Sequence, residues 1–163
     1  MPVVNFESVD IEKDPDTQLI IGHAGFIKTA EDLYEAMATS MPGVKFGIAF
    51  AEASGPCLVR SEGNDDALVS AAEKNALAIG AGHTFVILFK GAYPINVIEK
   101  VRNVQEVSEI FCSTANETQV IVGSTEKGRA VVGVVDGSAA KGIESAEEKE
   151  KRRKFLIDIG YKR

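Results

Sequence analysis

The chain has 163 residues, of which 45% are hydrophobic and 26% charged, and its formal net charge is −6. This composition is typical of a globular protein that buries a core without help from disulfides or metal ions. We therefore expect one domain over residues 1–163. The acidic balance argues against nucleic acids and anionic membranes as partners, because both favour basic surfaces. It leaves room for a small anionic ligand held by a few local donors.

The cysteine pattern and the first residues indicate a cytoplasmic protein without a membrane partner. Cys57 and Cys112 lie far apart, with no Cys or His cluster around them, so no metal site is expected. No apolar stretch approaches the ~18 residues of a transmembrane helix. Residues 1–14 carry early acidic groups and no basic segment before an apolar one, which is not the pattern of a secretory signal.

Short strands and helices alternate along the first two thirds of the chain. Strands are expected at residues 3–9, 17–22, 44–53, 57–63 and 83–91, and helices at 29–41, 65–79 and 94–103. Thr29 and Asp32 have the spacing of a capping box, Gly80 suits the end of the second helix, and Pro94 suits the start of the third. The segment 83–91 is the most hydrophobic strand and is predicted to be central.

Three β-rich segments follow, at residues 108–115, 118–125 and 129–137, and a charged helix is predicted at about 144–159. Its apolar residues Phe155, Leu156 and Ile159 are expected to pack on the body or on a neighbouring subunit. Strands interleaved with helices and followed by a β meander indicate an α/β domain whose mixed sheet is covered by helices.

The segment GSTEKGRA, residues 123–130, is the nearest approach to a phosphate-binding loop. Arg129 and Ala130 stand where the Lys and Ser/Thr of such a loop are required, and a strand rather than a helix follows. A hairpin turn is therefore the better interpretation.

The segment EASGPCLVR, residues 52–60, places four useful chemical groups around one tight corner. Ser54 and Gly55 can present backbone N–H groups to an anion, and Arg60 offers a planar fork for phosphate or carboxylate. Glu52 can accept from a ribose hydroxyl or act as a base. The simpler alternative is an ordinary turn closed by a Glu52–Arg60 ion pair, and the sequence does not decide between the two.

Three further segments carry candidate residues at junctions between elements, where ligands of α/β proteins often bind. His83 precedes the central strand and suits a base or a phosphoryl carrier. Tyr93 can stack on a base whose edge Asn96 binds, and Lys28 can neutralise a phosphate at a helix start. Each has a plain structural alternative: a histidine bonded to backbone, a proline-started helix and a solvated lysine.

Four segments together resemble the adenosine-specific kinase family: FIKTAEDLYEAM, GVKFGIAFAEASGPCLVRSEGND, NALAIGAGHTFVILFKGAYPINV and QVIVGSTEKGRAVVGVVDG. The resemblance covers about residues 6–142. It implies a compact three-layer α/β/α domain that forms homo-oligomers and binds adenosine and AMP, and the family name implies phosphoryl transfer to adenosine. His83 matches the family pattern. Relatives tend to carry histidine just before FIKT, whereas this chain has Gly25 there and His23 two residues earlier.

Two functions from different classes remain open. The first is a kinase that phosphorylates the 5′-hydroxyl of adenosine, with His83 and Glu52 as catalytic residues and with ATP and magnesium as the usual donor and metal of such chemistry. Lys28, Ser54, Gly55, Arg60, Tyr93 and Asn96 would bind the nucleoside or its phosphate. The second is a non-catalytic adenosine/AMP sensor, which the missing phosphate loop favours. The same pocket working as a phosphohydrolase is a third, weaker alternative.

Overall fold

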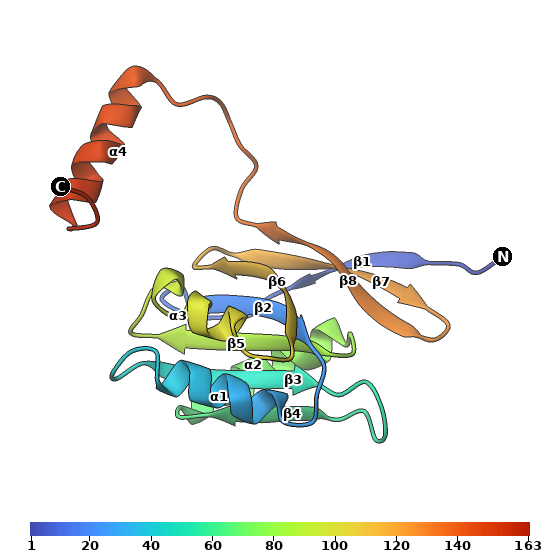
Figure 1. Ribbon diagram of the computed structural model, residues 1–163. Coiled ribbons are helices and arrows are strands. Elements are labelled where there is room, and N and C mark those ends of the chain that lie inside the picture. Colours follow the sequence, from blue (N-terminus) through green and yellow to red (C-terminus); the bar gives the residue numbers. More distant parts are fainter.

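The computed structural model describes residues 1–163 and contains eight strands and four helices (Figure 1). The strands are β1 Asn5–Asp10, β2 Gln18–Ala24, β3 Lys45–Ala51, β4 Val59–Gly63, β5 Thr84–Lys90, β6 Val107–Thr114, β7 Thr118–Thr125 and β8 Gly128–Asp136. The helices are α1 Thr29–Ala38, α2 Asp66–Ile79, α3 Pro94–Arg102 and α4 Ala146–Asp158. The order and type of the predicted elements are therefore confirmed.

The predicted mixed sheet is wrong, because the strands form two wholly antiparallel sheets. The larger sheet has five strands in the order β4-β3-β5-β2-β6, and the smaller has three in the order β1-β7-β8. Each strand–helix–strand unit does connect two strands that run in the same direction. In every case one antiparallel strand lies between them; β5, for example, separates β2 from β3. The order of strands and helices along the chain indicates the direction of each strand, but it does not determine which strands pair with each other.

Helices cover both faces of the five-stranded sheet. Leu33 and Met37 of α1, with Val97 and Val101 of α3, pack on one face against side chains such as Ile20. On the other face α2 shares the core with the inner side of the three-stranded sheet. The α/β class is confirmed, but a simple three-layer α/β/α arrangement leaves this second sheet out.

The central strand is β5, as predicted, and six of its seven residues are buried. It pairs with β2 through contacts such as Leu19–Leu88 and with β3 through contacts such as Phe50–Phe85. Because both of its edges and both of its faces are covered, a continuous apolar sequence is what this position requires.

The helix boundaries follow local chemistry at two of the three positions that the sequence marked, Gly80 and Pro94. Asp65 caps α2 by accepting from the N–H of Leu68 at 3.0 Å, and Gly80 ends it with a left-handed backbone at φ +61°. Pro94 opens α3. The capping box predicted at Thr29 is wrong: its hydroxyl instead accepts from the N–H of Phe26, three residues earlier, so it closes the preceding turn.

The last two predicted features of the chain are confirmed. Residues 123–130 form a β-hairpin in which Thr125 faces Gly128, not a phosphate loop. The charged helix α4 is capped by Ser145 and Glu148 and carries a Glu147–Lys151 ion pair, with an N–O distance of 2.7 Å. It stands apart from the two sheets at the end of an extended segment (Figure 1). None of the four helices has the length and apolarity needed to cross a membrane.

The contact between α2 and β3 depends on Gly47, which has no side chain to keep the two backbones apart. A Cβ atom at this position would lie 2.2 Å from the backbone carbon of Leu68 and the backbone nitrogen of Val69. We predict that Gly47→Ala lowers the free energy of unfolding by about 1–3 kcal/mol or more, because α2 must move to admit the methyl group.

Urea unfolding followed by circular dichroism measures this effect, with Gly133→Ala as the matched control. Gly133 also lies in a strand, and a Cβ atom there meets no atom within 4 Å. Equal stabilities for the two variants would show that the α2–β3 contact does not constrain the fold.

Candidate functional site

Most of the predicted site residues meet at one edge of the five-stranded sheet, which we call the site edge. Here β2 and β3 end and β4, β5 and β6 begin, because Ala51 pairs with Val59 and Ala24 pairs with Val107. The residues brought to this edge are Lys28, Glu52, Ser54, Gly55, Arg60 and His83. The antiparallel order therefore gathers residues that lie up to 55 positions apart in the chain.

Glu52 and Arg60 form an ion pair across the β3–β4 hairpin, with Arg60 Nε 3.3 Å from Glu52 Oε1. The Glu52 side chain is only 15% exposed, and Oε1 receives no hydrogen bond of good geometry. The charge contact is therefore made, but the acceptor capacity of this oxygen remains unused. Arg60 Nη1 donates to the carbonyl of Ile27 at 3.1 Å, which ties the corner to the segment between β2 and α1.

Ser54 and Gly55 lie in the exposed connection between β3 and β4, which projects beyond the sheet (Figure 1). Gly55 has a φ of +60°, and the N–H of Cys57 donates to the carbonyl of Ser54 at 3.2 Å. The loop is thus a tight turn, closed further by a hydrogen bond from the N–H of Glu52 to the carbonyl of Leu58 at 3.2 Å. The turn and the ion pair expected from the simpler interpretation are both present, and neither prevents an anion from binding here.

His83 occupies the middle of the site edge and has an unusual backbone conformation. Its N–H donates to the carbonyl of Ala51 at 2.7 Å, and its carbonyl accepts from the N–H of Ala24 at 2.9 Å. Its φ is +62°, a left-handed value that non-glycine residues seldom adopt. The imidazole stacks on Phe50, with ring centroids 5.9 Å apart and planes 18° apart. Such strain, held by two strands, is typical of functional positions.

His23 stands beside His83, with ring centroids 5.8 Å apart. Its Nδ1 lies 2.7 Å from Ser108 Oγ, and that hydroxyl donates to the carbonyl of His23 at 3.1 Å. Ser108 Oγ therefore bridges the ring and the backbone carbonyl of His23, and the histidine tautomer decides which atom donates in the Nδ1–Oγ contact. There is little in the sequence to select His23, because no motif around it indicates its contact with Ser108 of β6.

Gly25 lies directly over the His83 ring. A Cβ atom at Gly25 would be 3.0 Å from His83 Nδ1. The position just before FIKT therefore faces the imidazole of His83, the same ring that His23 contacts edge-on.

Lys28 reaches the site edge at the start of α1, where it is held by two carboxylates. It pairs with Asp32 one turn later and lies 3.5 Å from Glu106 Oε2. The hydrogen bond to Asp32, helped by the charge of Glu106, raises the pKa of this lysine above its ordinary value. Glu106 was missed by sequence reasoning; its side chain is 7% exposed, and its Oε1 has no partner. It precedes β6 in a segment without a recognisable motif.

Tyr93 and Asn96 lie at the opposite edge of the sheet. They follow the last residue of β5, whereas His83 precedes the first, so a seven-residue strand of about 20 Å separates them. The Asn96 side chain accepts from the N–H of Tyr93 at 2.8 Å and so caps α3. The plain structural interpretation holds for Asn96, and within one chain neither residue joins the other candidates.

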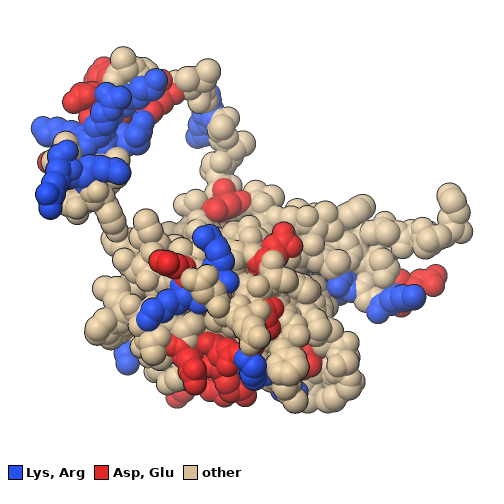
Figure 2. All heavy atoms as spheres, viewed as in Figure 1, with Lys and Arg blue, Asp and Glu red and all other residues tan.

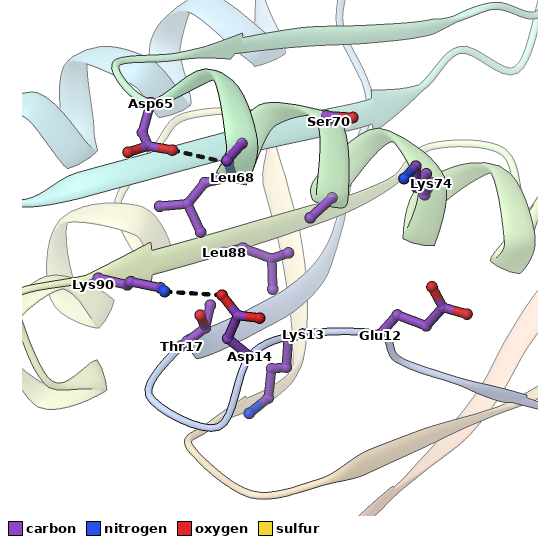
Figure 3. A pocket seen from close by; sticks show the side chains of 12 residues that line it. Glu12, Lys13, Asp14, Thr17, Asp65, Leu68, Ser70, Lys74, Leu88 and Lys90 are labelled. Carbon is purple, nitrogen blue, oxygen red and sulfur yellow. Dashed lines mark hydrogen bonds and ion pairs between the residues drawn. The ribbon is translucent and has the colours of Figure 1, made fainter.

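A cavity of about 690 Å³ lies at this opposite edge, between the start of α2 and the segment before β2 (Figure 3). Charged groups line it, and Lys90 pairs there with Asp14 and Asp16 at 3.0 Å each. These contacts raise the pKa of Lys90 and lower that of Asp16. The lining contains none of the predicted site residues. Of its three lysines, Lys13, Lys74 and Lys90, only Lys90 is neutralised by these aspartates.

The remaining nucleophiles differ in accessibility. Burial raises the pKa of the Cys112 thiol to about 11, so it stays protonated at neutral pH. Cys57 is exposed in the corner. No three His, Cys, Asp or Glu side chains converge as metal ligands do. At the site edge, the groups able to do chemistry are therefore two imidazoles, the shielded carboxylates of Glu52 and Glu106, the Asp32 carboxylate, two cations and the exposed Cys57 thiol.

The left-handed backbone of His83 determines which substitution tests its ring. We predict that His83→Ala lowers the free energy of unfolding by about 1 kcal/mol more than His83→Asn does, because asparagine tolerates a positive φ better than alanine. Urea unfolding of the two variants measures the difference. Identical stabilities would indicate that the backbone at this position carries no strain.

Comparison with known proteins identifies the family of this chain. The sequence model of the family described as adenosine specific kinase matches residues 9–162. The crystal structure of the PH1918 protein from Pyrococcus horikoshii OT3 has 51% sequence identity and a TM-score of 0.96, with 99% of each chain covered. No curated protein matches this chain. Because the family match extends over nearly the whole length, the chain belongs to the adenosine-specific kinase family.

Proposed function

We propose that the site edge binds adenosine and AMP and that the protein transfers a phosphoryl group to the 5′-hydroxyl of adenosine. The observation that supports this most directly is the convergence of Glu52, Arg60 and His83 at one edge of the sheet in a chain of this family. The shielded carboxylate suits a hydroxyl of the nucleoside, and the cation suits its phosphate. The imidazole suits a base or a phosphoryl carrier in the transfer.

In this proposal the β3–β4 corner holds the ribose and the phosphate. Oε1 of Glu52 is buried and has no hydrogen-bond donor, so a ribose hydroxyl that reached it would satisfy this acceptor without replacing a strong hydrogen bond. Arg60 is 41% exposed and already lies beside the loop of Ser54 and Gly55, so it can turn its fork to a phosphate. Lys28 supplies a second cation. Tyr93 and Asn96 could reach the adenine only from a second copy, and we assign them no role within one chain.

A route through His83 accounts for the transfer with the residues present. A ring nitrogen attacks the terminal phosphorus of a nucleoside triphosphate, its bond to phosphorus forms, and the bond to the leaving diphosphate oxygen breaks. The adenosine 5′-oxygen then attacks this phosphorus, its proton passes to Glu52, and the nitrogen–phosphorus bond breaks to free the imidazole. ATP with magnesium bridging its phosphates is the donor that such chemistry uses.

The second candidate, an adenosine/AMP sensor, is favoured by one specific observation. Residues 123–130 form a hairpin rather than a triphosphate loop, so the part of the chain most similar to a donor site does not provide one. A sensor needs the same nucleoside contacts at the site edge but no donor.

Titration calorimetry with adenosine, AMP, ADP and ATP, with and without magnesium, followed by an assay for AMP formed from adenosine and ATP, separates the two functions. We expect adenosine and AMP to bind and AMP to form, and we expect His83→Asn to abolish turnover while binding persists. His23→Asn is the companion variant. Binding without turnover in the native protein would establish the sensor, and full activity of His83→Asn would exclude the histidine route.

Arg60→Ala tests the phosphate contact separately from the nucleoside contact. We predict that it lowers the affinity for AMP by about 10–100-fold and the affinity for adenosine much less, because a charge-assisted hydrogen bond contributes roughly 1.5–3 kcal/mol. Calorimetric titration of both ligands measures the difference. Lys127→Ala, in the β7–β8 hairpin, removes an exposed cation elsewhere and serves as the control. Equal losses for the two ligands would contradict this role of Arg60.

A further inference from the structure

The purine ring of the proposed ligand has no partner among the residues assigned to the site edge. Glu52 and Arg60 account for the ribose and the phosphate, and His83 accounts for the transfer. Tyr93 and Asn96, which the sequence suggested for the base, lie beyond the other end of β5. A nucleoside held by its ribose places its base beside those ribose contacts, so a base-binding surface is required at the same edge.

Phe26 supplies an exposed aromatic ring at the site edge. Of the eight phenylalanines and three tyrosines, five are exposed: Phe6, Phe26, Tyr93, Phe155 and Tyr161. The other four lie on β1, after β5 and in the C-terminal segment, whereas Phe26 lies between β2 and α1. It exposes 56% of its surface. An aromatic ring left open to water at this point can stack on a base.

A tight turn holds the backbone of Phe26 in place. Its N–H donates to the Thr29 hydroxyl at 3.2 Å, and its carbonyl accepts from the N–H of Thr29 at 3.1 Å. Thr29 is fully buried, so the turn is anchored to the core. A ring on a fixed backbone has only its two side-chain torsions left to order, so it loses little conformational freedom when a ligand binds.

The residues on either side of Phe26 contact groups that are proposed to bind the nucleoside or its phosphate. Gly25 lies over the His83 ring, where a Cβ atom would be 3.0 Å from Nδ1. The carbonyl of Ile27 accepts from Nη1 of Arg60 at 3.1 Å. Because consecutive Cα atoms are about 3.8 Å apart, Phe26 lies along the chain between the imidazole contact and the guanidinium contact.

Apolar side chains extend this surface on both loops that meet at Arg60. Ile27 before α1 and Leu58 before β4 are each 63% exposed. The N–H of Glu52 donates to the carbonyl of Leu58 at 3.2 Å, so the apolar residues adjoin the polar groups of the site edge. Figure 2 shows the acidic side chains gathered over α1 and a largely uncharged surface beyond them, where the β3–β4 loop projects. Apolar walls beside a few polar groups are typical of ligand sites, and an uncharged wall suits a neutral purine.

We propose that Phe26 is the base-binding residue of the site edge and that its ring stacks on the purine of adenosine or AMP, with Ile27 and Leu58 beside it. This role of Phe26 rests on the nucleoside binding proposed for the site edge. Stacking recognises the base whether or not a phosphate is present, so Phe26 and Arg60 contribute to the affinity separately.

Titration calorimetry of adenosine and AMP with Phe26→Ala tests this role. We expect the affinity for both ligands to fall by the same factor, about 5–150-fold, which is the contribution of stacking one base on an aromatic ring. A variant that merely disturbed the turn would release Arg60 from Ile27 and would weaken AMP more than adenosine. Tyr161→Ala removes a similarly exposed ring outside the site edge and is the control.

Phe26→Trp supplies a second readout, because the chain contains no tryptophan. We expect this variant to retain the affinity that Phe26→Ala loses, since indole also stacks on a base. The fluorescence of its single indole should change when adenosine is added, and that change should saturate at the affinity measured by calorimetry.

Three results would overturn this role of Phe26 while leaving nucleoside binding intact. Unchanged affinities in Phe26→Ala would exclude stacking, and a loss confined to AMP would show that the ring only supports the turn. A loss in Tyr93→Ala without one in Phe26→Ala would assign the base to a neighbouring copy. A native protein that binds neither adenosine nor AMP would instead overturn the proposed function itself, and the stacking role with it.

Discussion

The arrangement of this protein depends on the insertion of β5 between β2 and β3. The strand is buried on both faces and hydrogen-bonded on both edges, so its position is fixed by the removal of an entire apolar segment from water. His83 immediately precedes the first residue of β5, and Tyr93 follows its last residue, so the two lie at opposite ends of this strand. The composition of the site edge is therefore a consequence of core packing, because the position of β5 determines which candidate site residues lie close together.

This insertion also explains which parts of the structure could be predicted from the sequence. Apolar periodicity, Gly80 and Pro94 identified the elements because those signals are local. The sheet pairing was wrong because it depends on which strand fills the gap between two strands of equal direction, and no short segment carries that information. The placement of Tyr93 and Asn96 at the far end of β5 was not predictable for the same reason. The Thr29 cap was wrong because the N-cap of α1 is Lys28, whose carbonyl accepts from the N–H of Asp32 at 2.9 Å, while the Thr29 hydroxyl accepts from the N–H of Phe26.

The site itself was predictable where one hairpin builds it and unpredictable where distant strands do. Glu52, Ser54, Gly55 and Arg60 belong to one turn, so their proximity follows from sequence distance alone. Glu106 and Ser108 enter through β6, and only the β2–β6 register brings them to Lys28 and His23. The two ends of the site edge thus have the same chemistry, a shielded carboxylate beside an exposed cation, with both imidazoles between them.

The two carboxylate–cation contacts determine which groups of the site edge are available to a ligand. Each carboxylate is paired loosely: one contact is an ion pair without hydrogen-bond geometry at 3.3 Å, and the other lies at 3.5 Å. Loose pairing of the shielded carboxylates leaves acceptor capacity that a tight salt bridge would consume. The two cations differ in this respect, because Lys28 is also bonded tightly to Asp32, whereas Arg60 has only the ion pair to Glu52 and a hydrogen bond to the carbonyl of Ile27. An edge arranged this way is already organised before any ligand binds, because the backbone of His83 and the ring of His23 are fixed by hydrogen bonds that a ligand does not need to form.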